Sequence, residues 1–262
     1  MDRDRILVIG PNQGLRNTKL FSLNTNLDEL NIVIWHPVTL YQEWSENSKG
    51  FNPQTRVQTF QERIGHLVKW VQLGHCLCIV GLWPYIDLKY QIRGEPFTYK
   101  PLLEEPFLGI AFEQTEGDLV EFCGIAEFPP GFANFIISMK YQGLLKGSEL
   151  IPLFRVYEGR DQILDRRGGS GGGSAAGYKK FGIVGGYKKL DAGIVMFLPT
   201  VNVTELTSVG ITWDDYHLSL FALSQNLPLT PMEVLQQVER DNKRIEELGQ
   251  QIRKALSQRP KS

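Results

Sequence analysis

The sequence predicts an α/β fold, a mostly parallel sheet flanked by helices, with one further helix at the C-terminus. The main observation is the stretch 59–84, which reads as an amphipathic helix running directly into a buried strand. Residues 76–80 are apolar without alternation, as in a strand covered on both faces. The apolar face of the helix recurs at helical spacing and is formed by Phe60, Ile64, Leu67, Val68 and Val71. A helix that feeds a doubly buried strand is half of a parallel α/β unit.

Both ends of this helix carry boundary signals. Thr59 and Glu62 have the spacing of a capping box, which predicts a helix start at Thr59 after a polar loop over residues 42–56. Gly74 follows the last apolar position, where a left-handed residue commonly ends a helix.

Short apolar runs predict the other strands. Residues 5–10 form a first strand that ends in a breaker-rich turn, and residues 31–35 form a second strand that His36 and Pro37 close. Residues 150–157 and 193–199 are two late strands. Residues 85–131 lie between the helix–strand stretch 59–84 and these two late strands. They carry several prolines, which predicts short strands and irregular covering structure.

Composition restricts the partners of the chain. It has 262 residues, of which 42% are apolar, so it can bury a substantial core. Its 28 Lys and Arg balance 29 Asp and Glu, so no whole-molecule field attracts it to DNA, RNA or an anionic membrane. The three cysteines are an odd number, and we find no signal peptide and no stretch of 18 apolar residues. We therefore expect a cytoplasmic protein without disulfides and without membrane contact.

We divide the chain into an α/β domain over residues 1–228 and a C-terminal amphipathic helix over residues 229–262. Residues 168–174 read GGSGGGS inside the first of these. Such a composition is typical of a natural flexible linker, and equally of an engineered replacement for a longer loop.

A local basic patch surrounds this Gly/Ser-rich stretch. The motif Gly-Tyr-Lys-Lys occurs twice, beginning at Gly177 and at Gly186. Basic residues with interleaved aromatics are what a groove for single-stranded nucleic acid needs. A solvated hairpin explains the patch more simply, because the total charge is near neutral. The candidate nucleic-acid residues are Arg166, Arg167, Lys179, Lys180, Lys188 and Lys189.

The C-terminal helix begins with strong signals, an N-cap Thr230, Pro231 at the first helical position and Glu233 at the third. Its apolar residues follow heptad a/d spacing, with Asp241 at one d position. The stripe is narrow, which favours a seam against another helix, either of a protein partner or of a second copy. The alternative is a terminal helix packed along its own domain. The candidate partner-binding residues are Val234, Val238, Ile245, Leu248 and Ile252.

A small-molecule pocket, if one exists, is expected at the carboxyl ends of the parallel strands, where open α/β sheets gather ligands. The residues that follow the first three predicted strands are Asn12, Gln13, His36, Trp83 and Tyr85. An amide pair, an imidazole and two aromatic rings could hold a sugar, a base or a peptide. The competing interpretation is that the aromatic side chains only pack against the carboxyl ends of the strands and bind no ligand.

The order of these segments resembles the type 1 glutamine amidotransferase-like superfamily, in its ThuA-like and trimerisation-domain-like branches. The resemblance rests on RILVIG, NIVIW, HLVKWVQLGHCLCIVG, LIPLFRV and DAGIVMFLP. It is a resemblance of fold, and a general flavodoxin-like sheet produces much the same pattern. It implies a degenerate domain of the kind that serves as a subunit of larger bacterial assemblies, defence systems included.

The chain departs from the catalytic pattern of that superfamily. Active members place a nucleophilic cysteine on the turn after the third strand, where this chain has Gly81 and Leu82. Cys76 and Cys78 lie inside the strand, where burial raises a thiol pKa, and Cys123 has no His-x-Glu after it. We therefore assign no catalytic residue.

The search for cofactor sites gives no candidate either. No phosphate-binding glycine motif follows a strand, and the histidines at 36, 66, 75 and 217 do not have metal-ligand spacing. We expect His66 to be solvated or hydrogen-bonded on the rim of the apolar helix face. We assign no cofactor and no metal.

Three functional hypotheses follow. The first is a noncatalytic α/β scaffold that docks into a larger assembly through its C-terminal helix. The second is a hydrolase or small-ligand-binding protein that uses the strand-end cluster. The third is contact with nucleic acid through the basic loop 166–189, which predicts salt-sensitive binding.

Overall fold

The computed structural model describes most of the chain up to residue 228 and six helical positions beyond it. The described residues are 3–23, 26–40, 43, 53–81, 88–92, 95–99, 106–117, 120–123, 128–136, 138–157, 181–208, 210–228, 239, 243, 246, 247, 250 and 251.

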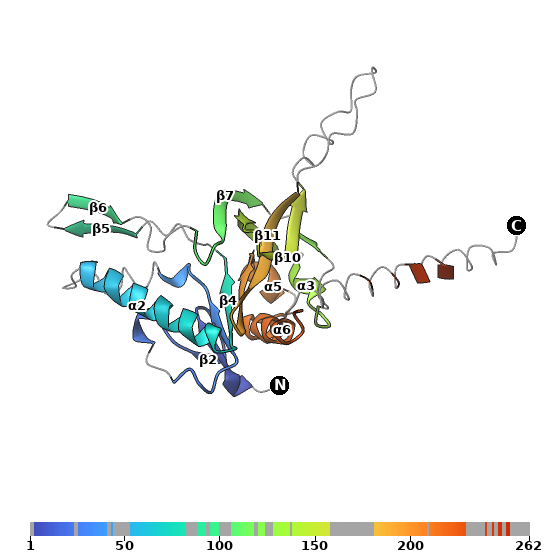
Figure 1. Ribbon diagram of the computed structural model, residues 1–262, viewed down its shortest axis with the longest axis horizontal. Helices are drawn as coiled ribbons and strands as arrows, with labels where there is room; N and C mark the ends of the chain where they lie inside the picture. The colour runs from blue at the N-terminus through green and yellow to red at the C-terminus, as the bar shows by residue number, and fades with distance from the viewer. Residues whose placement is uncertain are drawn as a thin grey trace, which may run out of the picture.

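A large mixed sheet forms the centre of the protein (Figure 1). Its eight strands run in the order β2 (Arg16–Asn17), β1 (Ile6–Ile9), β3 (Ile32–Trp35), β4 (Cys76–Val80), β12 (Gly193–Leu198), β11 (Phe181–Leu190), β10 (Ile151–Tyr157) and β8 (Glu121–Phe122). The neighbours from β2 to β12 are parallel, and those from β12 to β8 are antiparallel. The predicted α/β class with a mostly parallel sheet is confirmed.

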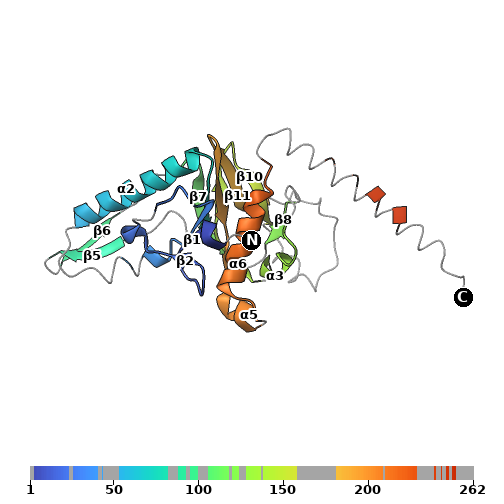
Figure 2. The ribbon, with the colours of Figure 1, turned by 90° about the horizontal axis from the view of Figure 1, so that it is seen from below.

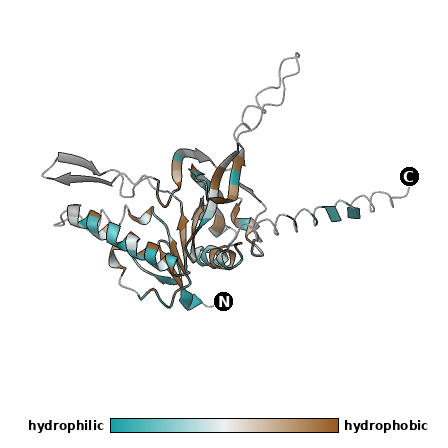
Figure 3. Ribbon diagram, viewed as in Figure 1, coloured by the Kyte–Doolittle hydropathy of each residue, from teal (hydrophilic) through white to brown (hydrophobic). Residues whose placement is uncertain are grey.

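The central strands are apolar because both faces of the sheet are covered. Every residue of β1, β3, β4 and β12 is buried, and alternate side chains enter two separate cores. Helix α2 (Pro53–Gln72) packs Phe60 and Leu67 into one core, and helix α6 (Trp213–Gln225) packs Tyr216 and Leu220 into the other. Figure 3 shows the hydrophobic residues concentrated in the strands and the hydrophilic residues on the outer side of α2.

The start of α2 differs from the prediction. The helix begins at Pro53, so the expected loop over residues 42–56 is too long and Thr59 is not an N-cap. The Thr59 hydroxyl instead donates to the carbonyl oxygen of Thr55 at 2.9 Å, one turn back within the helix. Proline is favourable in a first helical turn, which explains the earlier start. The predicted end is confirmed, because Gly74 has a left-handed φ of 113°.

Smaller elements surround the main sheet. One further sheet joins β13 (Thr200–Val201), β9 (Met139–Lys146) and β7 (Ala111–Gly117), and a hairpin joins β5 (Leu88–Ile92) to β6 (Glu95–Tyr99). The short helices are η1 (Arg3–Arg5), η2 (Leu20–Ser22), α3 (Ala133–Ile136) and α5 (Val203–Ser208). The short strands expected in the proline-bearing region are therefore present.

The Gly/Ser-rich stretch 168–174 lies outside the described residues. Its position in the topology is nevertheless defined, because β10 and β11 are antiparallel neighbours and Tyr157 pairs with Phe181. Residues 158–180 thus connect two strands that already lie side by side. Such a connection tolerates either a natural linker or an engineered one.

The six described positions beyond residue 228 are helical and exposed. Both views place them away from the sheet, toward the C-terminus (Figures 1 and 2). Within the described part of the chain, no helix combines the length and apolar character needed to cross a membrane.

Candidate functional site

Two buried histidines meet at the carboxyl ends of the parallel strands. His36 directly follows β3, and His217 lies in the second turn of α6. Their Nε2 atoms are 2.9 Å apart, and the two residues are 1% and 0% exposed. The contact joins the edge of the sheet to the helix that covers it.

The histidine pair is enclosed by an aromatic ring and a glycine. Trp213 stacks on His217 with ring centroids 5.6 Å apart, and it meets the His36 ring edge-on at 5.1 Å. A Cβ at Gly10 would lie 2.7 Å from the His36 ring, so only glycine lets the end of β1 approach this closely. The φ of 155° at Gly10 favours glycine as well. The pair is therefore a packed part of the interior.

A second contact ties the loop after β1 to the same helix. The backbone N–H of Gln13 donates to Oδ1 of Asp214 at 3.0 Å. Asp214 is itself buried, at 9% exposed. Helix α6 thus holds two strand-end turns, one through His217 and one through Asp214.

Burial keeps both imidazoles neutral at pH 7. Burial lowers the pKa of His36 well below its usual value, and the neighbouring His217 lowers it further. Burial also lowers the pKa of His217 to about 4, although the Asp214 carboxylate acts in the opposite direction. In a neutral pair, one Nε2 carries a hydrogen and donates a hydrogen bond to the Nε2 of the other ring. Nδ1 of His217 is buried without a hydrogen-bond partner in the described structure. The tautomer with the proton on Nε2 of His217 therefore avoids a buried N–H without an acceptor at Nδ1.

The structure brings together part of the predicted strand-end cluster. The side-chain amide of Asn12 donates to the carbonyl oxygen of Leu15, and the Gln13 side chain is exposed. His36 lies close to these turns, yet its ring faces α6 instead of solvent. Trp83 and Tyr85 lie outside the described residues.

Sequence reasoning missed the α6 half of this cluster. Trp213, Asp214 and His217 belong to a helix that opens with a capping box between Thr212 and Asp215. That signal could have located the helix and placed positions 213 and 217 on one face. No local pattern, however, pairs a residue with one 181 positions away.

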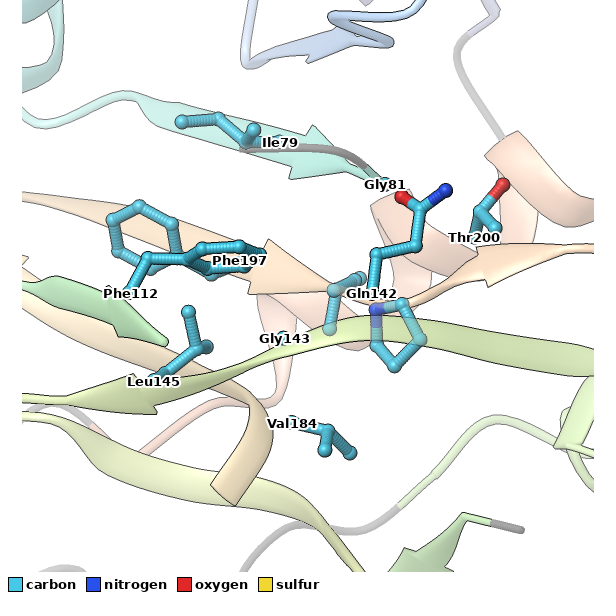
Figure 4. Close-up of a pocket in the computed structure, with 11 residues that line it drawn as sticks. Ile79, Gly81, Phe112, Gln142, Gly143, Leu145, Val184, Phe197 and Thr200 are labelled. Carbon is cyan, nitrogen blue, oxygen red and sulfur yellow. The ribbon is translucent and has the colours of Figure 1, made fainter. Parts of the chain in front are cut away.

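A small pocket lies at the carboxyl ends of the neighbouring strands β4 and β12 (Figure 4). Its volume of about 20 Å³ has room for a water-sized group. Its wall is mainly apolar, and Gln142 of β9 and Thr200 of β13 contribute the polar side chains. The described members of the predicted ligand cluster, Asn12, Gln13 and His36, are not among the residues that line this pocket.

The cysteines behave as predicted for structural thiols. Cys76 and Cys78 are buried, and burial raises the pKa of Cys76 to about 12 and that of Cys78 well above its usual value. Cys123 is partly exposed, and its pKa is also raised by burial, against the opposing charge of Arg155. A raised pKa disfavours the thiolate, which is the nucleophilic form.

The two remaining histidines lie elsewhere in the fold. His66 is exposed on α2, as expected. His75 stacks on Trp70 with ring centroids 4.5 Å apart. Among the residues that the structure describes, no group of three or more His, Cys, Asp and Glu side chains is arranged to hold a metal ion.

The basic patch is only partly described, and its described members differ from one another. The Lys188 ammonium lies 2.6 Å from the Glu149 carboxylate and donates to the carbonyl oxygen of Leu108 at 2.9 Å. Lys189 is exposed, whereas the neighbouring Tyr187 is 1% exposed and cannot stack on a base. The other members lie outside the described residues, and they are Arg166, Arg167, Lys179 and Lys180.

The fold and these contacts define a mixed α/β protein with a large, mostly parallel sheet. No protein-family model and no curated protein matches the chain. Among solved structures it is similar to a β-galactosidase from Bacillus circulans sp. alkalophilus, at 12% sequence identity and a TM-score of 0.35. That alignment covers 79% of this chain and 24% of the β-galactosidase chain.

Proposed function

We propose that this protein is a noncatalytic α/β scaffold that docks a helical protein partner, or a second copy of itself, through its C-terminal helix. The observation that carries the proposal is the exposure of all six described positions between residues 239 and 251, which are helical and lie away from the sheet. A helix that leaves its own domain has an apolar seam available for another molecule.

The described positions coincide with the outer face that the heptad pattern assigns. With Val238 at position a, they fall at b, c, f and g, and all of them are polar: Glu239, Lys243, Glu246, Glu247, Gln250 and Gln251. Polar residues at these positions are typical of a helix whose a/d seam faces a partner. The seam residues Val234, Val238, Ile245, Leu248 and Ile252 themselves lie outside the described residues.

The start of this segment is anchored to the sheet. The Tyr187 hydroxyl of β11 donates to the carbonyl oxygen of Pro228 at 2.8 Å, and Leu227 is buried in the core. Pro228, the last residue described before the C-terminal segment, is therefore held beside β11.

The packing at the strand ends supports the scaffold role. In α/β enzymes this edge holds the reacting groups. Here the Nε2 atoms of His36 and His217 hydrogen-bond to each other in the interior, and the Trp213 ring packs against both imidazoles. Under this proposal the edge stabilises the domain, and the assignment to a degenerate amidotransferase-like or flavodoxin-like fold is part of the same proposal.

Charge-introducing substitutions in the seam test the proposal. Ile245→Asp and Leu248→Asp place a carboxylate at a and d positions, so we expect loss of self-association in light scattering or loss of the native partner in pull-downs from the source cell. Gln250→Asp is the matched control, because it adds the same charge at an exposed f position. Circular dichroism and the unfolding midpoint of the α/β domain should not change in any variant.

The opposite result would refute the proposal. If deletion of residues 230–262 leaves the molecular mass in solution and the set of captured partners unchanged, the helix is not the docking element. If Gln250→Asp disrupts association as strongly as Leu248→Asp, charge alone explains the effect.

A further inference from the structure

We propose that the partner of the C-terminal helix is a helix of a different chain, which carries a basic side chain opposite Asp241, and that a second copy of this chain is disfavoured as the partner. The inference rests on the docking role proposed above. It goes further by naming the chemistry that the partner needs at one position of the seam.

Asp241 is the charged residue of an otherwise apolar seam. With Val238 at position a, Asp241 stands at position d. The six helical positions that the structure describes in this segment fall at b, c, f and g and are exposed, which is consistent with this phase. A carboxylate inside such a seam loses hydration and needs a partner of opposite charge. The other a and d positions between 234 and 255 are apolar: Val234, Val238, Ile245, Leu248, Ile252 and Ala255.

A parallel pair of two copies would bring like charges together. In a parallel coiled coil in register, each d position faces the same d position of the second helix. The two Asp241 carboxylates would therefore share one layer of the seam. Like charges that face each other in a desolvated interface repel, so this arrangement disfavours self-association.

An antiparallel pair of two copies leaves the carboxylate without a counter-ion. In that arrangement d positions face a positions, so Asp241 would meet Ile245 or Ile252 in the two registers with the longest overlap. Arg259 also falls at an a position, but it directly precedes Pro260, which disfavours helical backbone there. The register that reaches Arg259 also leaves the first heptad of the seam uncovered.

The flanking positions do not compensate within a pair of identical helices. Ion pairs between coiled-coil helices need opposite charges at the e and g positions. Arg244, at position g, is the charged residue among them, so two copies gain no such ion pair. A partner helix that offers a base to Asp241 and an acid to Arg244 gains both contacts. The other e and g positions between 235 and 256 are uncharged: Leu235, Gln237, Asn242, Gly249, Gln251 and Leu256.

Asp241 therefore acts as a specificity element in this proposal. A single polar residue in a seam lowers the stability of association and selects among partners and registers. Discrimination of this kind works by penalising the wrong partner, here the identical helix.

Sedimentation velocity on the full-length protein tests the exclusion of self-pairing. We expect the unchanged protein to be a monomer. Asp241→Leu places a favoured residue at d, so it should strengthen self-association by at least about tenfold. Asp241→Asn removes the charge but stays polar, so it should fall between the two. Gln250→Leu is the matched control, because it adds the same side chain at an exposed f position and should stay monomeric.

Three synthetic peptides of residues 229–262 test the need for a base. They carry Asp241→Lys, Ile245→Lys or Ile252→Lys, so the lysine faces Asp241 of the protein in a parallel pair or in one of the two antiparallel registers. We expect one of them to bind the full-length protein at least about tenfold more tightly than the unchanged peptide, measured by fluorescence anisotropy. Asp241→Leu in the protein should abolish that preference, because the lysine then faces leucine.

Three results would overturn the inference. The first is an unchanged protein that is a dimer and that Leu248→Asp converts to a monomer, because a second copy then occupies the seam and the docking role stands. The second is equal self-association of Asp241→Leu and Gln250→Leu. The third is that no lysine peptide binds more tightly than the unchanged peptide. The docking role is tested separately, by the deletion of residues 230–262.

Discussion

The imidazole rings of His36 and His217 meet Nε2 to Nε2 at 2.9 Å in the interior, although 181 positions separate them in the sequence. One ring stands at the end of β3 and the other on α6, so the contact fastens the helix to the sheet edge. The rings are neutral and share one hydrogen bond. Protonation of both would place two positive charges in contact inside the core.

The first prediction concerns acid stability. Both folded-state pKa values are lowered below the ordinary histidine value, so the unfolded chain binds more protons below about pH 6.5. The stability that the neutral pair contributes is present above that pH and is lost as the pH falls toward 4. A shift from 6.5 to about 4 for His217 corresponds to about 3 kcal/mol. Urea unfolding between pH 7.5 and pH 4.5 measures this slope.

Substitution of the pair should reduce that slope. His217→Phe keeps a ring beside Trp213 but cannot titrate, so the variant should lose less stability on acidification. It should also be less stable at pH 7.5, because the His36 ring loses its partner. The exposed His66→Gln is the control and should follow the unchanged protein. A His217→Phe variant with the original slope would contradict the assignment.

The second prediction concerns Gly193, the first residue of β12. A Cβ there would collide with two backbone carbonyl oxygens, that of Val71 in the last turn of α2 and that of His75 directly before β4. Because backbone cannot move aside cheaply, Gly193→Ala should destabilise the protein by roughly 3 kcal/mol or more. Gly65→Ala is the matched control. Gly65 lies within α2, where a Cβ meets open space, so alanine should stabilise by roughly 0.5–1 kcal/mol.

The third prediction concerns thiol reactivity. Cys123 is partly exposed, whereas Cys76 and Cys78 are buried in the core under α6. A thiol reagent at pH 8 should therefore modify one cysteine slowly in the folded protein and three in urea. Cys123→Ser should abolish the reaction of the folded state. Fast modification of a second thiol would show that α6 opens readily.

The central strands could be predicted from sequence because burial on both faces leaves a continuous apolar run. The predicted strands over residues 76–80 and 193–199 correspond to β4 and β12 for this reason, and β12 ends one residue earlier, at Leu198. The start of α2 was predicted less accurately. Thr59 has capping-box spacing, but its hydroxyl donates a hydrogen bond to a backbone carbonyl within the helix.

The candidate site was predictable only on the sheet side. The rule for strand ends located Gln13 and His36, but it says nothing of the helix that covers them. The contacts of α6 through Asp214 and His217 depend on how the chain returns over the sheet. Gln142 was missed for the same reason, since it reaches the strand ends from β9 of a different sheet.

The fourth prediction concerns the hydrogen bond between Tyr187 and Pro228. Tyr187 is 1% exposed, and its hydroxyl donates to the carbonyl oxygen of Pro228 at 2.8 Å. Tyr187→Phe removes this bond and leaves the carbonyl without its donor, so it should cost about 1 kcal/mol. Amide exchange at Leu227 should accelerate, because the end of the domain is released. Tyr216→Phe is the control, since that hydroxyl makes a longer contact of 3.5 Å with the carbonyl oxygen of Pro199 and should cost less. Equal costs for the two variants, with no change at Leu227, would show that the end of the described domain is held by apolar packing instead.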